Sequence, residues 1–401
     1  MIMNSKQAIE LDSLYMAETY GRFPIAFAKG KNASAYDCDG KKYLDLTSGI
    51  GVNSLGIADD EWVRAVSAQA ADIAHICNYF VSPQTVTLAE KLVRLSGLKR
   101  VFMANSGGEA NEGAIKTARK YSHDRYGEQR STIISLCNSF HGRTVTTLAA
   151  TGQDGFHTHF GPFTEGFKYS PLNDLAALKE AMTPDVCAVM AEPVQGEGGV
   201  YPMSDEFAEG MYELCREKDV LIIFDEVQCG IGRTGKMFAF ENFNNVKPDI
   251  MTLAKGLGGG LPIGAFLLGE KCEHTLGHGQ HGSTFGGNPV SAAGANVVID
   301  RLTAPGFLDS VTEKGRYICG KISAMGIPYI TEIRGRGMML GAAVDVGSGK
   351  TAAAFAKKAA ENGLLVLTAG GNTIRLLPPL TITYDELDEA LALFEKTAGE
   401  I

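Results

Sequence analysis

The sequence predicts an α/β protein in which a large domain with a mostly parallel central sheet is joined to a smaller α+β domain built from both ends of the chain. Short, nearly continuous apolar runs alternate with helical stretches from about Leu92 to Leu268, which is typical of a parallel sheet covered on both faces. An Asp39-Gly40 dipeptide lies between two strand-like arms, which indicates a hairpin. After about Pro289 the pattern changes to long helices with short strands.

The elements are expected in three consecutive parts of the chain. Residues 1–47 contain the hairpin sequence YDCDGKKYLDL. Residues 290–401 contain the Ala-rich helix VSAAGANVVIDRL and the strands GMMLGAAVDV and TIRLLPP, so we expect these two parts to form the small domain together. Residues 48–289 form the expected large domain. Its strand-like segments are KRVFMAN, STIISLCN, VCAVMAEP, VLIIFDE, PDIMTLAK and GAFLLGE.

Composition and charge limit the class of protein. The chain has 401 residues, 45% hydrophobic and 21% charged, which is enough for two or three domains with sizeable cores. A formal charge of −9 gives no general attraction for nucleic acid or an anionic membrane. No apolar run approaches the ~18 residues of a membrane span, and the N-terminus lacks a signal-peptide pattern. The eight cysteines form no CxxC pair. We expect a cytoplasmic protein with reduced cysteines and no nucleic-acid or membrane partner.

Three local patterns resemble known binding motifs, and each has a simpler interpretation. Residues 347–351 look like the end of a Walker A loop, but Val344 stands where that loop needs glycine. Residues 230–235 match GxGxxG without a clear helix start after them, so an NAD-linked oxidoreductase remains only an alternative. The histidines within residues 274–281 lie in a glycine-rich stretch, where no helix would bring them onto one face. We therefore predict no metal site.

Two charged residues at the ends of expected strands indicate a ligand site with a reactive amine. Asp225 ends the apolar run 220–224, and ligands of open α/β sheets bind beyond the carboxyl ends of the strands. Lys255 ends the next such run and precedes GLGGGLP. A lysine between an apolar strand and a glycine-rich loop is poorly solvated, which disfavours its charged form and leaves an amine able to form a Schiff base with an aldehyde. Taken alone, Asp225 could be a helix cap and Lys255 an ordinary strand-end residue.

Two further segments supply groups for an anion and for a planar ring. Ser106, Gly107 and Gly108 follow a strand and precede a helix, where free N–H groups and the helix dipole favour a phosphate. Phe140 and Arg143 follow another strand and could stack on a ring and bind a carboxylate. Together with the strand-end lysine and acid, these are the groups that pyridoxal 5′-phosphate requires, because the acid keeps the pyridine nitrogen protonated.

The order and spacing of seven segments then resemble the class III aminotransferases of fold type I. The resemblance runs from about Tyr20 to the C-terminus, and its DEVQ and AKGLGGG segments are highly specific. It implies the fold type I architecture of PLP-dependent transferases, pyridoxal 5′-phosphate as cofactor, and a homodimer with shared active sites. The segments are NSGGEANEGAIKTARKY, FHGRT, EPVQGEGGV, DEVQCGIGRTG, LAKGLGGGLPIGA, HGSTFGGNP and IRLLPP.

Carried over by position, the resemblance assigns two catalytic residues and a set of cofactor contacts. Lys255 resembles the Schiff-base lysine, and Asp225 resembles the partner of the pyridine nitrogen. Phe140 would stack on the ring, and Gln228 would hydrogen-bond the ring hydroxyl. The expected cofactor contacts are Ser106, Gly107, Gly108, Phe140, Asp225, Glu226, Val227, Gln228, Lys255 and Thr284.

Two of these positions have a particular meaning in the resemblance. Thr284 matches the threonine that reaches the phosphate from the neighbouring subunit, which is why a dimer is implied. Gly108 stands where alanine is more common in this loop. A smaller residue there should keep the N–H donor and change only the packing.

The same resemblance predicts how substrates bind. Arg143 and Arg375 resemble the two carboxylate-binding arginines, and Glu197 resembles the glutamate that pairs with the second of them. If Glu197 neutralises Arg375 for a donor with one carboxylate and releases it for 2-oxoglutarate, one site accepts both in turn. Ser283 matches a position near the acetylated substrate.

The implied reaction is transfer of the terminal amino group of N2-acetylornithine to 2-oxoglutarate, with glutamate as product. Ile50 and His141 stand where ornithine aminotransferases of this group have tyrosine and tryptophan, which argues against free ornithine as donor. Succinylornithine, 4-aminobutyrate, N-acetyl-diaminopimelate and ornithine itself remain alternative donors. A PLP-binding protein without catalytic activity is a third hypothesis.

Overall fold

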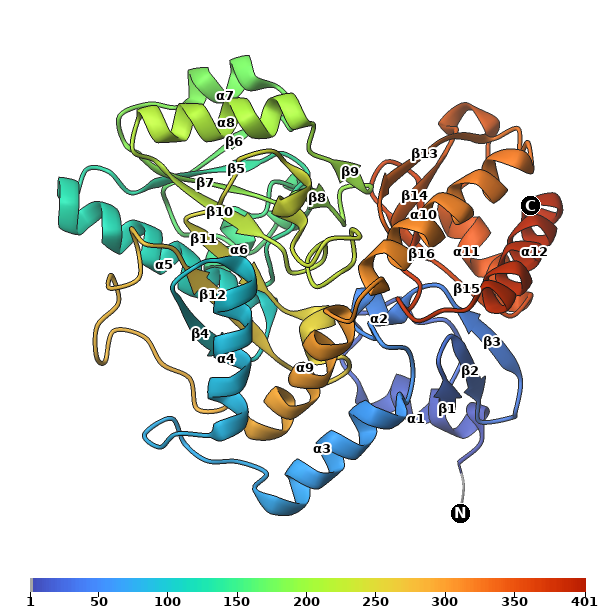
Figure 1. Cartoon of the computed structure of the whole chain (residues 1–401). Helices are drawn as coiled ribbons and strands as arrows, with labels where there is room; N and C mark the ends of the chain where they lie inside the picture. The colour runs from blue at the N-terminus through green and yellow to red at the C-terminus, as the bar shows by residue number, and fades with distance from the viewer. Residues whose placement is uncertain (1–2) are drawn as a thin grey trace.

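The computed structural model describes residues 3–401 and is built around a seven-stranded sheet (Figure 1). The sheet is parallel except for one strand that runs antiparallel to both of its neighbours, Gly264–Leu268. The prediction of a mostly parallel central sheet is therefore confirmed. In spatial order the strands are β4 (Arg100–Ala104), β12 (Gly264–Leu268), β11 (Ile250–Leu253), β10 (Leu221–Asp225), β7 (Val186–Ala191), β5 (Thr132–Leu136) and β6 (Phe167–Ser170).

Helices cover both faces of this sheet. Those in the same part of the chain are α2 (Ser48–Gly51), α3 (Asp60–Asp72), α4 (Pro83–Ser96), α5 (Gly107–Tyr126), α6 (Val145–Ala150), α7 (Leu175–Ala181) and α8 (Asp205–Glu217). Successive residues of β10 enter different apolar clusters, since side chains alternate along a strand. Ile223 packs in a cluster with Ala114 of α5, whereas Phe224 packs in another cluster with Phe207 of α8.

Two smaller four-stranded sheets lie beside the large one (Figure 1). The first contains β1 (Phe27–Lys31), β2 (Ser34–Asp37), β3 (Lys42–Asp45) and β15 (Leu364–Leu365). The second contains β13 (Ile330–Arg336), β14 (Met339–Val344), β17 (Thr373–Leu376) and β16 (Leu367–Ala369). The remaining elements are α1 (Ser5–Tyr15), β8 (Val194–Gln195), β9 (Tyr201–Pro202), α9 (Pro289–Leu302), α10 (Phe307–Ala324), α11 (Ala352–Glu361), α12 (Tyr384–Glu400) and the 3₁₀ turns η1 (Asp154–Phe156), η2 (Ala239–Asn242), η3 (Lys255–Gly258) and η4 (Val346–Ser348).

The first small sheet joins the two ends of the chain. Leu44 of β3 pairs in parallel with Leu364 of β15. The predicted hairpin is present: β2 and β3 are antiparallel, and Gly40 in their connection has φ of 90°, which glycine adopts without strain. The large sheet uses residues 100–268 only. On this basis we retain the division into 1–47, 48–289 and 290–401 as a proposal.

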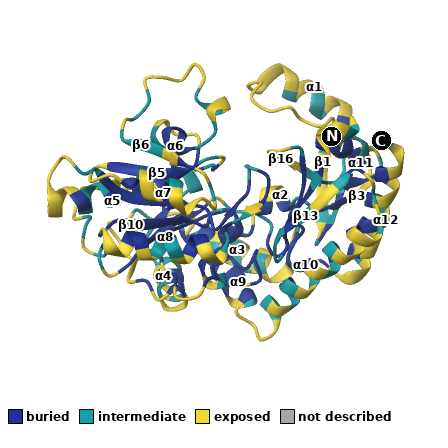
Figure 2. Cartoon of the chain, turned by 90° about the horizontal axis from the view of Figure 1, so that it is seen from above, coloured by how far each residue is buried: buried dark blue, intermediate teal, exposed yellow. Residues whose placement is uncertain are grey.

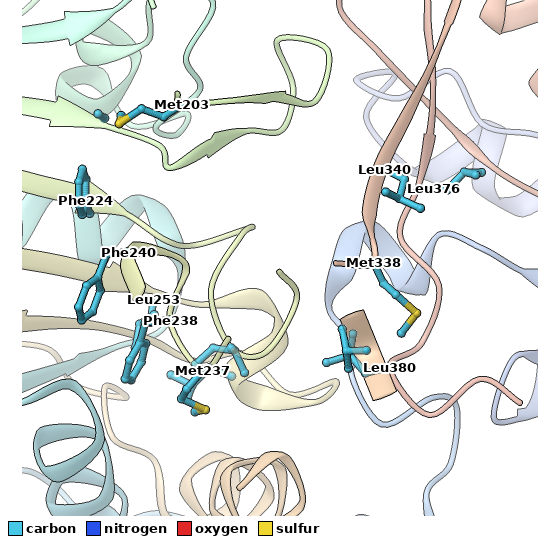
Figure 3. Close-up of a cluster of buried hydrophobic side chains, with 14 of the residues drawn as sticks. Met203, Phe224, Met237, Phe238, Phe240, Leu253, Met338, Leu340, Leu376 and Leu380 are labelled. Atoms are coloured by element: carbon cyan, nitrogen blue, oxygen red, sulfur yellow. The ribbon is translucent and has the colours of Figure 1, made fainter. Parts of the chain in front are cut away.

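One apolar cluster connects the large sheet to the C-terminal part of the chain. Figure 3 shows Phe224 and Phe238 on one side of this cluster and Met338 and Leu376 on the other. Buried residues concentrate in the sheets, whereas the outer faces of helices such as α12 are exposed (Figure 2). The apolar cluster fixes the position of β17 relative to β10, and both strands carry predicted site residues.

None of the helices in residues 3–401 combines the length and apolar character that crossing a membrane requires.

Candidate active site

A cavity of about 630 Å³ lies where several strands of the large sheet end. Its walls come from the segments that follow β4, β5, β7, β10 and β11. This is the position expected for a ligand in an open α/β sheet, and the volume suits a small molecule. The predicted residues in its lining are Ser106, Gly107, Gly108, Phe140, Arg143, Asp225, Val227, Gln228 and Lys255.

Asp225 ends β10 and is held by three donors. Its Oδ2 accepts hydrogen bonds from Asn111 Nδ2 and His141 Nδ1, each at 2.7 Å, and its Oδ1 accepts one from Val227 N at 3.0 Å. Because an ionised carboxylate only accepts, His141 carries its proton on Nδ1. Thr252 in turn donates to Asn111 Oδ1 at 2.7 Å. The network holds a buried carboxylate at the cavity wall in one orientation.

Lys255 is the first residue of η3 and lies two positions after Leu253, the last residue of β11. Its φ is 43°, a left-handed conformation that is uncommon for a residue with a side chain. Such strain persists when the surrounding structure enforces it, and it is frequent at functional sites. Burial lowers the pKa of Lys255, while the negative charge of Glu197 opposes this shift. The fraction of neutral amine at the cavity is therefore higher than for an exposed lysine.

The phosphate loop predicted from the sequence is the N-terminus of α5. Ser106 is the N-cap, and its Oγ accepts a hydrogen bond from Glu109 N at 3.2 Å. Gly107 is required by packing, since a Cβ there would lie 2.7 Å from a methyl carbon of Val227. At Gly108 a Cβ would make an ordinary contact, 3.8 Å from Thr144. The helix dipole and the N–H groups of this turn favour an anion.

Arg375 and Glu197 form a two-point ion pair beside the cavity. Their N–O distances are 2.6 and 3.2 Å, and Arg375 Nη1 also donates to Gln228 Oε1 at 2.9 Å. Burial alone would raise the pKa of Glu197, but the charge and hydrogen bonds of Arg375 lower it overall. Since Gln228 lines the cavity, the ion pair lies directly behind the cavity wall. Within residues 3–401, Arg375 Nε has no hydrogen-bond partner.

Besides Glu197 and Arg375, three predicted site residues do not line the Lys255 cavity. Ser283 and Thr284 line a second, larger cavity of about 1320 Å³. Ser283 is connected to the first cavity, because its Oγ accepts a hydrogen bond from Asn105 Nδ2 at 3.1 Å. The carboxylate of Glu226 is buried and accepts hydrogen bonds from the backbone N–H groups of residues 239 and 240. Burial raises the pKa of Glu226 to about 8. The position of the Glu226 side chain therefore does not support the predicted contact with the cofactor, which stays a prediction.

The structure also identifies site residues that sequence reasoning did not assign. Glu192 lines the cavity, and its carboxylate accepts N–H bonds from Phe140 at 3.0 Å and Gly196 at 3.2 Å. Burial raises the pKa of Glu192 to about 7. Asn111 and His141 hold Asp225. A sequence signal existed only for Asn111, which lies about one helical turn beyond the phosphate loop and so near the same site.

Comparison with known proteins supplies the family. Residues 15–398 match the family described as aminotransferase class III. Acetylornithine aminotransferase of Haemophilus ducreyi is 50% identical over 400 residues, and that of Methanocaldococcus jannaschii is 46% identical over 404 residues; all of this chain and all of each relative are covered.

Solved structures agree with this match over nearly the whole chain. An ornithine aminotransferase from Toxoplasma gondii has a TM-score of 0.94 at 32% identity, covering 99% of this chain and 96% of that one. An N-acetylornithine aminotransferase from Stenotrophomonas maltophilia has a TM-score of 0.84 at 37% identity, covering 98% of each chain. The predicted fold class and resemblance are confirmed, and the chain belongs to the class III aminotransferases.

Proposed function

We propose that this chain is a transaminase that uses pyridoxal 5′-phosphate to move the terminal amino group of N2-acetylornithine to 2-oxoglutarate. The products are N-acetylglutamate 5-semialdehyde and glutamate. The proposal rests on a difference between the two arginines at the site: one has an acid partner and the other has none. Arg143 lines the cavity with its guanidinium beside aromatic rings, whereas Arg375 is neutralised by Glu197. One available cation suits a donor with one carboxylate. The names of the curated relatives support the same reaction.

The residues of the cavity fit pyridoxal 5′-phosphate. The N-terminus of α5 offers N–H groups for the phosphate, and the absence of a Cβ at Gly107 lets this turn pack directly against Val227 of the cavity wall. Asp225 offers a buried carboxylate for the pyridine nitrogen, and Phe140 offers an aromatic ring. When bound, the cofactor supplies an aldehyde that takes up an amino group and a ring that withdraws electrons. Lys255 holds the amine that would join it.

The catalytic work of the chain itself is proton transfer and charge placement. Lys255, with its pKa lowered by burial, would take a proton from the carbon that bears the donor's amino group and deliver it to the carbon of the cofactor's aldehyde group. In the second half of the reaction it would move a proton the other way, to the former keto carbon of 2-oxoglutarate. Asp225 keeps a proton at the pyridine nitrogen, because its buried carboxylate favours a positive charge beside it. Asn111 and His141 keep that carboxylate oriented.

Glu197 allows one site to accept two kinds of substrate. With the amine donor, Glu197 stays paired with Arg375, so the donor's uncharged chain meets a neutral wall. With 2-oxoglutarate, the substrate's second carboxylate replaces Glu197 on Arg375, and the unpartnered Nε adds a further donor. Arg143 binds the single carboxylate of the donor and the remaining carboxylate of 2-oxoglutarate.

We propose a homodimer in which Thr284 of one protomer serves the site of the other. Thr284 lines the second cavity, next to the exposed segment Tyr79–Val81, whose three side chains are between 66% and 95% exposed. Asn78 ties this segment to the Thr284 loop through bonds of 2.9 Å to the carbonyls of Ser283 and Gly286. An exposed apolar segment of this kind is typical of a surface that a partner covers. The predicted cytoplasmic location stays a prediction.

A pair of glycine substitutions tests whether the N-terminus of α5 binds the phosphate. We expect Gly107→Ala to weaken binding of pyridoxal 5′-phosphate about tenfold or more, because its Cβ would overlap Val227 and displace the loop. We expect Gly108→Ala to bind the cofactor as the wild type does, since a Cβ there makes only an ordinary contact. Equilibrium dialysis of the apoenzyme measures both. Equal affinities for the two variants would place the phosphate elsewhere.

A panel of amine donors tests the proposed reaction. With 2-oxoglutarate as acceptor and glutamate formation as readout, we expect the highest kcat/KM for N2-acetylornithine. Free ornithine should be used at least about tenfold less well, since Glu192 and Glu197 are already engaged by backbone N–H groups and by Arg375, and leaving the second ammonium unpaired is unfavourable. N2-succinylornithine and N-acetyl-diaminopimelate complete the panel. A maximum with 4-aminobutyrate would overturn the acylated donor, and a protein inert to every amine would overturn the activity itself.

A further inference from the structure

The guanidinium of Arg143 is held by aromatic rings instead of by acids. Its central carbon lies 4.2 Å from the centre of the Phe156 ring and 5.4 Å from the centre of the Phe140 ring. The two rings meet edge to face with centres 5.8 Å apart. Among the ion pairs of residues 3–401, Arg375 has an acid partner and Arg143 has none. Among the rings in contact with Arg143, Phe156 is therefore the nearest to this guanidinium, which has no acid partner.

The position of Phe156 is fixed from both sides. It is the last residue of η1, and two residues that flank this turn, Gln153 and His157, form hydrogen bonds to backbone carbonyls of the preceding segment. Gln153 Nε2 donates to Ser139 O at 3.0 Å, and His157 Nε2 lies 2.9 Å from Leu148 O. A carbonyl only accepts, so His157 Nε2 is the donor. These two carbonyls lie before and after Arg143 in the chain, so the loop that carries Phe156 is fastened to both ends of the segment that carries Arg143.

An aromatic ring can hold an arginine without using its hydrogen bonds. The face of the ring attracts the cation, while the N–H groups point outward in the plane of the guanidinium. A carboxylate partner would instead occupy two of those donors and compete with the substrate. A side chain that is already ordered also loses less entropy when it binds a ligand. The arrangement keeps Arg143 both fixed and unoccupied.

We propose that Phe156 is a positioning residue that orders Arg143 and thereby sets the preference of the enzyme for donors that carry a carboxylate. The inference rests on the proposed function, because it takes a carboxylate as the ligand of Arg143. It adds a residue outside the family motifs described above. Phe156 acts through Arg143 and is not among the residues that line the cavity with Lys255 and Asp225. Its removal should therefore affect substrate affinity and leave the proton transfer unchanged.

The test compares two donors that differ only in the carboxylate. N2-acetylornithine has it, and N-acetyl-1,4-diaminobutane lacks it. We expect Phe156→Leu to raise KM for N2-acetylornithine about threefold to tenfold with kcat nearly unchanged, which corresponds to the loss of one cation–π contact and of side-chain order. For N-acetyl-1,4-diaminobutane we expect no change. Calorimetry with N-acetylnorvaline, which has the carboxylate but no reacting amine, should show the same loss of affinity.

Two further variants separate positioning from general damage to the loop. Phe156→Tyr keeps the aromatic face and should restore the wild-type KM. Phe160→Leu changes an aromatic ring that is 64% exposed in the same loop and should change nothing. If Phe156→Leu weakens both donors equally, or weakens neither, Phe156 does not position Arg143. A wild-type enzyme that shows no preference for the donor with the carboxylate contradicts the proposed function instead.

Discussion

Replacing Lys255 with alanine should lower kcat with N2-acetylornithine and 2-oxoglutarate by at least about 10⁴-fold, since one side chain supplies both the amine that holds the cofactor and the base that moves the proton. Alanine has a Cβ as lysine does, so the backbone conformation with φ of 43° is no more strained than before, and the loss of one buried amine should leave the fold intact. Glutamate formation measures the activity, and circular dichroism measures the fold.

A matched lysine provides the control for this experiment. Lys247 lies before β11, is exposed, and donates to the Gly97 carbonyl at 2.8 Å, so Lys247→Ala should keep full activity. In the wild type, borohydride reduction of the cofactor-loaded enzyme should fix the cofactor to the peptide that contains Lys255. Substantial turnover by Lys255→Ala, or a label on another peptide, would contradict the assignment.

The sequence predicted those parts of the site that depend on one strand and the residues after it. Apolar runs located β10 and β11, and the rule that ligands bind beyond strand ends placed Asp225 and Lys255 at one cavity. The glycines after β4 located the N-terminus of α5 in the same way. Each of these predictions needs only local periodicity and the topology of a parallel sheet, both of which are visible in a single sequence.

The parts that the sequence did not reveal depend on contacts between distant segments. Asn111 reaches Asp225 across 114 positions of the chain, and His141 reaches it across 84. No spacing rule connects such residues, because the register of α5 against the sheet is set by packing. Glu192 was missed because a sequence does not show which backbone N–H groups a glutamate accepts from, and these bonds are what hold its carboxylate at the cavity. Thr284 lines the second cavity, so its contact with the cofactor phosphate stays a prediction that rests on the proposed homodimer.

Replacing Asp225 with asparagine should reduce kcat about 10²–10³-fold, the usual effect of removing one preorganised electrostatic group from a site. The exchange keeps the size of the side chain and an oxygen that can accept from Asn111 or His141, so the fold should survive. What it removes is the negative charge that favours a proton on the pyridine nitrogen. The visible spectrum of the bound cofactor, followed against pH, should shift when this proton is lost, because the ring is conjugated with the chromophore, and kcat reports the effect on the reaction.

A second buried acid, Asp249, serves as the control that shows whether the effect on the spectrum and on kcat is specific to the charge of Asp225. Asp249 stands at the opposite end of β11, where its carboxylate accepts a hydrogen bond from Ile222 N at 2.9 Å. Asp249→Asn should lower the free energy of unfolding and leave the pH dependence of the spectrum unchanged. His141→Ala should reduce kcat less than Asp225→Asn, since His141 only orients the carboxylate. If Asp225→Asn kept the wild-type spectrum and kcat, the hydrogen-bonding shape of residue 225 would suffice, and the network around it would serve folding alone.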